Sequence, residues 1–160
     1  MSMRFIAAPL ALACGFAAAA APASNDSTAI ERGRYVVRVA GCNDCHTRGF
    51  AASGGNVPEA DWLTGDTLGF AGPWGTTYPS NLRLKLGDMD LATWTTYARS
   101  LKTRPPMPFW AVNAMTDDDL RAVWAYVRSL GPAGEPAPAA LAPGQVAKGP
   151  VVRFPAAPAH

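Results

Sequence analysis

Histidine and cysteine are scarce in this chain, which has two of the first and three of the second among its 160 residues. A structural zinc site uses about four ligands. Beyond the N-terminal segment, the nitrogen and sulfur donors are Cys42, Cys45, His46 and His160. Cys45 and His46 are adjacent and do not readily converge on one tetrahedral centre. The scarcity of these residues therefore disfavours a zinc protein.

Charge is also scarce and nearly balanced, with 14 Lys and Arg against 12 Asp and Glu and a charged fraction of 16%. The sequence has no basic run and no alternation of basic with aromatic residues, so the usual signature of a nucleic-acid-binding protein is missing. It also has no visible internal repeat. The length left after an N-terminal leader is typical of one domain.

The long uncharged run of the sequence lies at its N-terminus, from Phe5 to Ala20, and follows a single Arg4. Ala21-Pro22-Ala23 then supplies an A-x-A cleavage site, which predicts that residues 1–23 are a secretory signal peptide. Pro9 and the high alanine content make this run weak as a membrane span, which needs about 20 strongly apolar residues. We expect export to the periplasm, with membrane association only through an N-terminus that is uncleaved or is lipidated at Cys14.

The most specific pattern is Cys42-Asn-Asp-Cys45-His46, which matches the C-x-x-C-H attachment signature of c-type haem. The two thiols can add to the two haem vinyl groups, and the two-residue spacer lets one turn present both sulfurs to one porphyrin edge. His46 is then held beneath the iron as its axial ligand. A thioredoxin-like redox site would need a βαβ context, whereas the flanks here predict a helix and a glycine-rich loop. The single motif predicts one covalently bound haem c.

The second axial ligand has few candidates, because the sequence after the motif offers the thioethers of Met89, Met107 and Met115 and one further histidine, His160. Met107 lies in the stretch 104–109, where three prolines restrict the backbone. A thioether is a weak ligand that benefits from being held in place, so we expect Met107 to bind the iron. Histidine–methionine ligation suits electron transfer.

Three stretches predict helices. The first covers residues 28–40, where Thr28 and Glu31 resemble a capping box. The second runs from Asp88 or Asp90 to about residue 101, with apolar residues at helical spacing. The third covers residues 116–130, with an N-cap threonine, acidic residues in its first turn and a closing glycine.

Residues 47–87 form a long, glycine-rich connection, and connections of that length in a compact domain are usually functional. We expect this one to wrap the edge of the haem. The Trp74 N–H and the Tyr78 O–H are the expected partners of the haem propionates, with Asn81 and Arg83 as further candidates. The alternative for each aromatic side chain of the connection is a place in the ordinary core: Trp62, Phe70, Trp74 and Tyr78.

The C-terminal segment, residues 131–160, is rich in alanine and proline and nearly free of charge. Its proline content argues against a helix. We expect either an extended strap or a disordered extension, attached to a domain that covers residues 24–130.

At this point the chain resembles a known family. The helix before the Cys42–His46 motif, the Pro-Pro-Met107-Pro loop and the closing helix up to residue 130 look like a class I cytochrome c. Residues 72–82 are similar to a loop of the haem c domains in the cytochrome subunits of bacterial periplasmic dehydrogenases. The resemblance implies an all-α, cytochrome c-like fold with long haem-wrapping loops. It also implies crossed first and last helices, with Gly33 or Tyr35 near the crossing and Tyr126 opposite.

The resulting hypothesis is a periplasmic electron carrier that passes single electrons from a dehydrogenase to an oxidase or another cytochrome. It is not expected to be an enzyme, because Ser80 and Ser100 have no partner histidine once His46 binds iron. Two alternatives stay open at this stage. One is a haem c subunit docked permanently in a dehydrogenase complex, and the other is a sensor or enzyme with an open iron site.

Overall fold

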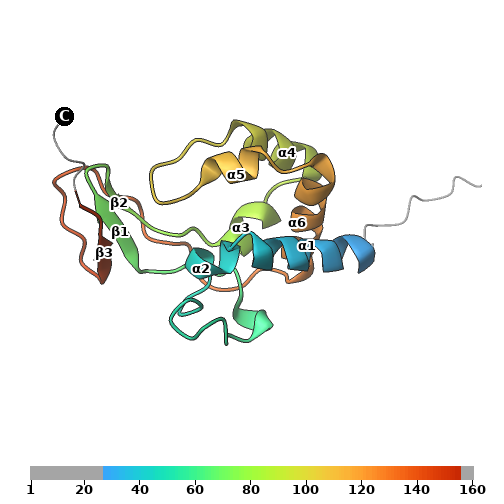
Figure 1. Cartoon of the computed structure of the whole chain (residues 1–160), viewed down its shortest axis with the longest axis horizontal. Coiled ribbons are helices and arrows are strands. Elements are labelled where there is room, and N and C mark those ends of the chain that lie inside the picture. The colour runs from blue at the N-terminus through green and yellow to red at the C-terminus, as the bar shows by residue number, and fades with distance from the viewer. Residues whose placement is uncertain (1–26, 156–160) are drawn as a thin grey trace, which may run out of the picture.

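The computed structural model describes residues 27–155, so the predicted signal peptide, Cys14 and His160 lie outside the described range (Figure 1). Within this range, no helix has the length and apolar character needed to cross a membrane. The elements in chain order are α1 (Ser27–Val39), α2 (Cys42–His46), the single 3-10 turn η1 (Glu59–Asp61), β1 (Gly69–Gly72), β2 (Gly75–Thr77), α3 (Leu82–Gly87), α4 (Leu91–Ser100), α5 (Phe109–Asn113), α6 (Asp117–Ser129) and β3 (Val151–Arg153).

The three predicted helices are present as α1, α4 and α6, and their ends follow the capping chemistry of the sequence. The Asp90 carboxylate accepts a hydrogen bond from the Thr93 N–H at 2.7 Å, which makes Asp90 the N-cap of α4. The Thr116 hydroxyl accepts one from the Asp119 N–H at 3.1 Å at the start of α6. Gly131 ends α6 with a φ of 69°, a left-handed conformation that glycine adopts without strain.

Helices α1 and α6 cross at Gly33, which confirms one of the two positions that the resemblance implied. A Cβ atom on Gly33 would lie 2.6 Å from the Cβ of Tyr126 and would collide with the Ala122 carbonyl. Tyr35, the other position, is 55% exposed. The Tyr126 hydroxyl donates a hydrogen bond to Glu59 at 2.9 Å, and burial raises the pKa of Tyr126. The absence of a side chain at Gly33 therefore allows the two backbones to approach closely.

One apolar core surrounds this crossing and joins the helices to the connection after α2. Trp62 belongs to it, with its indole N–H donating to the Val57 carbonyl at 2.9 Å. The core residues come from α1, α3, α4, α6 and that connection: Val36, Val37, Trp62, Leu63, Leu86, Trp94, Ala98, Leu120, Val123, Tyr126 and Val127.

The expectation of an all-α fold is only partly correct, because a three-stranded sheet accompanies the helices. Its strand order is β2-β1-β3, with β1 antiparallel to β2 and parallel to β3. Figure 1 shows the sheet at the end of the molecule opposite α6. Strands β1 and β2 form a local hairpin, and the C-terminal segment runs back along the molecule as an extended strap that adds β3 to the edge of this hairpin. A pairing between segments so distant in sequence leaves no local periodicity to detect.

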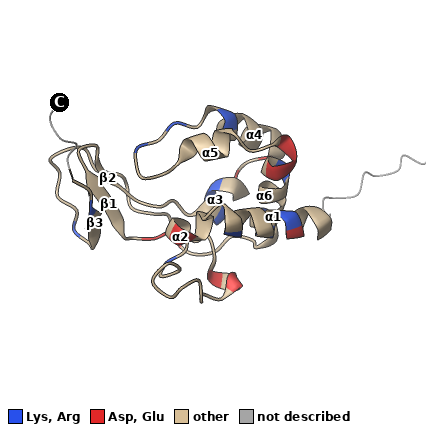
Figure 2. Ribbon diagram, in the orientation of Figure 1, with Lys and Arg blue, Asp and Glu red and all other residues tan. Residues whose placement is uncertain are grey.

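Charged residues are concentrated on a few elements. Figure 2 shows an acidic first turn in α6, and neither α5 nor strands β1 and β2 carry a charged residue. Ion pairs join α1 to its neighbours, with Arg32 2.8 Å from Asp119 and Arg34 2.8 Å from Glu59. The pairs thus tie α1 to α6 and to η1.

Candidate haem site

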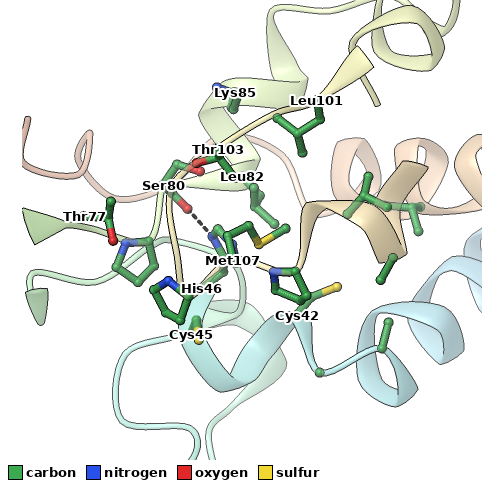
Figure 3. A pocket seen from close by; sticks show the side chains of 18 of the residues that line it. Cys42, Cys45, His46, Thr77, Ser80, Leu82, Lys85, Leu101, Thr103 and Met107 are labelled. Atoms are coloured by element: carbon green, nitrogen blue, oxygen red, sulfur yellow. Dashed lines mark hydrogen bonds between the residues drawn. The ribbon is translucent and has the colours of Figure 1, made fainter. Parts of the chain in front are cut away.

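A cavity of about 320 Å³ opens beside α2, a volume at the lower end of the range of about 300–1,000 Å³ that is usual for cofactor and ligand sites. Helix α2 and the Met107 loop (residues 101–108) both contribute to its lining (Figure 3). Much of its wall is apolar: Leu82, Leu86, Trp94, Leu101, Val112 and Val123.

Helix α2 presents the attachment motif to this cavity. Gly41 precedes it with a φ of 69°, and this left-handed turn separates the short helix from α1. Cys42 and Cys45 are three residues apart on one helical turn, a spacing that places their side chains on the same face. Both sulfur-bearing side chains and His46 line the cavity.

The imidazole of His46 is oriented by a backbone carbonyl. Its Nδ1 lies 2.7 Å from the Ser80 oxygen, and the residue is 8% exposed (Figure 3). Because a carbonyl can only accept, Nδ1 carries the proton and Nε2 keeps its lone pair. A histidine held in this way is prepared to bind a metal through Nε2.

Hydrogen bonds also fix the backbone on either side of His46. The His46 carbonyl accepts from the Gly65 N–H at 2.8 Å. The Thr47 hydroxyl donates to the Asn43 side chain at 2.8 Å and accepts from the Leu63 N–H at 2.8 Å. These bonds join α2 to the loop that follows it and restrict movement of the imidazole.

Burial determines the protonation of the three motif side chains. Desolvation lowers the pKa of His46, which favours the neutral imidazole that can act as a ligand. The same effect raises the pKa of Cys42 to about 11 and raises that of Cys45. The unattached protein therefore holds two neutral thiols and a neutral imidazole at physiological pH.

The structure separates the methionine candidates into two groups. Met107 and Met115 both line the cavity, whereas Met89 packs against the hydrophobic core. Figure 3 shows the Met107 thioether directed into the cavity that His46 also faces. Met115 is a second thioether in the same lining, which the sequence pattern did not distinguish from packing.

The predicted propionate partners are placed differently from one another. Tyr78 lines the cavity, whereas Trp74 and Asn81 are not part of its lining. The Trp74 indole N–H donates to the Phe70 carbonyl at 3.4 Å. The side-chain oxygen of Asn81 accepts from the Leu84 N–H and caps α3, and the side-chain NH2 donates to the Ala133 carbonyl at 2.7 Å. A contact of Trp74 or Asn81 with the cofactor stays a prediction.

Arg83, the further candidate for the polar edge, is buried and donates to the carbonyls of Gly131, Leu130 and Ala60. It closes the end of α6, where unpaired carbonyls need donors.

Four polar lining residues were not anticipated from the sequence: Thr77, Lys85, Thr103 and Arg104. Arg104 begins the proline-rich stretch 104–109, and this position close to Met107 could have indicated that it lies at the site. The Ser80 carbonyl that orients His46 had no such signal, because any residue there would supply the same oxygen.

The residues of the cavity fit haem c. Two thiols and an imidazole come from α2, a thioether faces the same space, and the remaining wall is largely apolar. Within residues 27–155, no group of three or more His, Cys, Asp or Glu side chains gathers as an alternative metal site. The side chains placed to hold the group are those of Cys42, Cys45 and His46, and the thioethers of Met107 and Met115 share the lining with them.

A helical fold with crossed terminal helices and a C-x-x-C-H turn beside an apolar cavity defines a c-type cytochrome. The chain belongs to the cytochrome c family, whose model matches residues 30–131. Membership of this family implies covalently bound haem c and haem-based electron transfer. The resemblance noted in the sequence is therefore confirmed.

Similar proteins include cytochrome subunits of dehydrogenases. The chain is 27% identical over 128 residues to the fructose dehydrogenase cytochrome subunit of Gluconobacter japonicus, covering 73% of this chain and 24% of that protein. It is 28% identical over 149 residues to the cytochrome c subunit of the quinone alcohol dehydrogenase of Gluconacetobacter polyoxogenes, covering 85% and 29%. A nicotinate dehydrogenase subunit from Pseudomonas putida is 31% identical over 120 residues, which cover 69% of this chain and 9% of that protein. The chain thus spans a minor part of each relative's length, and no solved structure matches it.

Proposed function

We propose that this chain is a periplasmic electron-transfer protein that carries one haem c with His46 and Met107 as axial ligands. The observation that carries the proposal is the shared cavity, in which the oriented imidazole and the Met107 thioether face the space beside the two attachment cysteines. When bound, haem c would supply a one-electron Fe(III)/Fe(II) couple.

The chain's own residues would make this couple suited to transfer. Two preorganised axial side chains leave little to rearrange when the charge of the iron changes. An apolar wall limits water near the site and, with the thioether, favours the reduced state. In this scheme His46 binds the iron, so its imidazole is not available as a catalytic base.

The proposed partner is a dehydrogenase that donates electrons to this chain. The relatives support this class of donor, since their names describe cytochrome subunits of fructose and alcohol dehydrogenases. Whether the chain is a free carrier or a docked subunit is tested by purifying it from its natural source with a small tag. A carrier elutes alone at the size of its own mass, whereas a docked subunit elutes with dehydrogenase activity. Location is tested by fractionation, with release in the periplasmic fraction as the expected result.

The electron-transfer proposal is tested on the haem-loaded protein by voltammetry and optical spectroscopy. A reversible one-electron couple, a low-spin ferric spectrum and slow reaction of the ferrous form with carbon monoxide are expected. A high-spin spectrum together with rapid carbon monoxide binding would instead establish the open-site sensor or enzyme.

A further inference from the structure

The C-terminal strap, residues 132–155, follows the part of the chain that matches the cytochrome c family model, residues 30–131. Figure 1 shows the strap leaving α6 and running to the sheet at the opposite end of the molecule. A segment rich in proline and alanine has little tendency to fold by itself. The path of the strap must therefore be held by its contacts with the remainder of the molecule.

The strap begins beside the residue that orients His46. The Ser80 carbonyl accepts from His46, and the next residue, Asn81, donates to the carbonyls of Ala133 and Glu135 at 2.7 and 3.2 Å. The first part of the strap is thus attached to the start of α3.

The strap ends against the sheet and an aromatic cluster. Strand β3 pairs in parallel with β1. The Phe154 ring then packs 5.5 Å from the Trp74 ring and 6.4 Å from the Phe70 ring, measured between centroids. Phe70 lines the cavity, so the end of the strap supports one of the cavity's walls.

The middle of the strap contacts the β1–β2 hairpin and, through Arg104, the Met107 loop. Leu141 and Thr76 exchange backbone hydrogen bonds of 2.8 and 3.1 Å. One nitrogen of the Arg104 guanidinium donates to the carbonyls of Leu141 and Trp74, each at 2.9 Å. The strap passes so close to Gly75 that a Cβ atom there would lie 2.8 Å from the Ala142 carbonyl carbon. One side chain therefore joins the loop, the hairpin and the strap.

The Met107 loop depends on these contacts because it has few others. Pro105, Pro106 and Pro108 have no N–H to donate. In the part of the chain that the structure describes, the hydrogen bonds that join this loop to the hairpin and the strap are those of Arg104 and one from the Thr77 hydroxyl to the Pro105 carbonyl at 2.9 Å. Its other bonds go to the adjacent α5, where the Phe109 N–H donates to the Met107 carbonyl at 2.9 Å and the Asn113 amide donates to the Leu101 carbonyl at 3.3 Å.

We propose that the C-terminal strap and Arg104 form a clamp that holds the Met107 loop closed over the haem cavity. Arg104 is in this view a positioning residue for the Met107 thioether, and the strap supplies the carbonyl that holds Arg104. The proposal rests on the proposed ligation by His46 and Met107. A weak thioether ligand dissociates whenever its loop opens, so the strength of the clamp sets how often the sixth iron position is accessible.

The clamp is tested on the full-length, haem-loaded ferric protein by the rate at which added imidazole binds the iron. Loss of a hydrogen bond from a charged donor should raise the open population, and hence the binding rate, about tenfold in Arg104→Gln. Arg104→Lys keeps one charged donor and should fall between this variant and the wild type. Phe154 is not itself a lining residue, so Phe154→Ala removes the strap's aromatic anchor and keeps every lining side chain, and it should also raise the rate.

Arg128→Gln is the matched control, because Arg128 likewise donates to two backbone carbonyls, those of Gly87 and Met89, at 2.8 and 3.3 Å. Gly87 and Met89 belong neither to the Met107 loop nor to the strap, so the imidazole rate of Arg128→Gln should equal that of the wild type. Because Arg104 and Phe154 act through one strap, the double variant should show less than the product of the two single effects.

Two results would overturn the clamp while leaving the ligand assignment intact. The first is a wild-type near-infrared iron–thioether band together with unchanged imidazole rates in Arg104→Gln and Phe154→Ala. The second is an equal increase in Arg128→Gln, which would show that the rate follows general stability. If the wild type lacks that band, the Met107 ligation fails, and the clamp fails with it.

Discussion

The Cα of Gly33 in α1 faces the Cβ of Tyr126 in α6 so closely that a Cβ atom built on Gly33 would lie 2.6 Å from it. This approach sets the crossing of the two helices. It also positions the start of α2, because α2 follows α1 after the turn at Gly41. A residue outside the cavity lining thus helps to fix the place from which the two cysteines and His46 are presented.

Gly33→Ala should therefore destabilise the protein by about 1–3 kcal/mol or more, the usual cost of overpacking a rigid site. The neighbour is backbone, which cannot rotate away. Denaturant unfolding of the haem-loaded protein would measure the loss. Gly87→Ala is the control, because nothing lies within 4 Å of a Cβ at Gly87. Equal stabilities for the two variants would contradict the close-packed crossing.

Replacing both cysteines, Cys42→Ala with Cys45→Ala, should abolish covalent attachment of haem. The sulfurs are the side-chain atoms that bond to the cofactor, and alanine offers no replacement. The measurement is haem-dependent peroxidase staining after denaturing electrophoresis. The wild type should stain and the double variant should not. Staining of the double variant at wild-type intensity would show that attachment occurs elsewhere.

The ion pair between α1 and α6 predicts an acid-dependent loss of stability. The Arg32 guanidinium, which hydrogen-bonds the Asp119 carboxylate, lowers the pKa of Asp119. A carboxyl whose folded pKa is depressed stabilises the fold above its unfolded pKa of about 4, and this stabilisation is lost as the pH falls through the folded value. Asp119→Asn should therefore be less stable than the wild type at neutral pH, by less than about 1 kcal/mol for so exposed a pair, and the gap should close in acid.

Asp118→Asn serves as the comparison for this ion pair. Asp118 occupies the same first turn and shares its favourable dipole interaction, but its nearest cation is Arg121 on the same helix at 3.8 Å. Unfolding curves at several pH values should show a smaller pH-dependent gap for Asp118→Asn. An identical gap for both variants would assign the effect to the helix dipole alone.

Much of this architecture follows from local sequence signals. The capped ends of α4 and α6 and the C-x-x-C-H motif were predicted from the types of residue at those positions, whereas the helix crossing near Gly33 or Tyr35 was implied by the family resemblance. Helices α3 and α5 were missed because they span only one or two turns, too few for an apolar period to appear. Strand β3 was missed because it finds its partner across a long separation in sequence, and the β1–β2 hairpin was missed because its strands have only four and three residues, too few for an alternating pattern to appear.

Some site residues could not be predicted from the sequence, because their positions also depend on contacts between segments that are distant in sequence. Side chains could be predicted as candidates wherever their chemistry is specific, as for His46 and Met107. The Ser80 carbonyl and the presence of Met115 in the cavity lining depend on how distant segments pack. Asn81 illustrates the same point, because its amide is used by the strap that the sequence left undecided between order and disorder.

The assignment of the sixth ligand is the prediction on which the functional proposal depends most directly. Both Met107 and Met115 line the cavity, so proximity alone does not choose between them. Met115 directly precedes the N-cap of α6 and packs against the hydrophobic core, and its carbonyl accepts from Arg99 at 2.5 Å. Met107 lies on a proline-framed loop that faces the cavity. This difference favours Met107 as the iron ligand and Met115 as a packing residue.

Met107→Ala should accordingly abolish the near-infrared band of the ferric iron–thioether bond. The reduction potential should also fall, because a thioether favours the reduced iron over the harder ligand that would replace it. Met115→Ala should keep the band and lose stability, by less than the about 2–5 kcal/mol typical of a fully buried methionine because Met115 is only partly buried. Met89→Ala should keep the band as well. Optical titration, voltammetry and unfolding of the three haem-loaded variants separate these outcomes. If the band survives in Met107→Ala but disappears in Met115→Ala, Met115 is the iron ligand. If the wild type lacks the band at neutral pH, the open-site alternative is favoured.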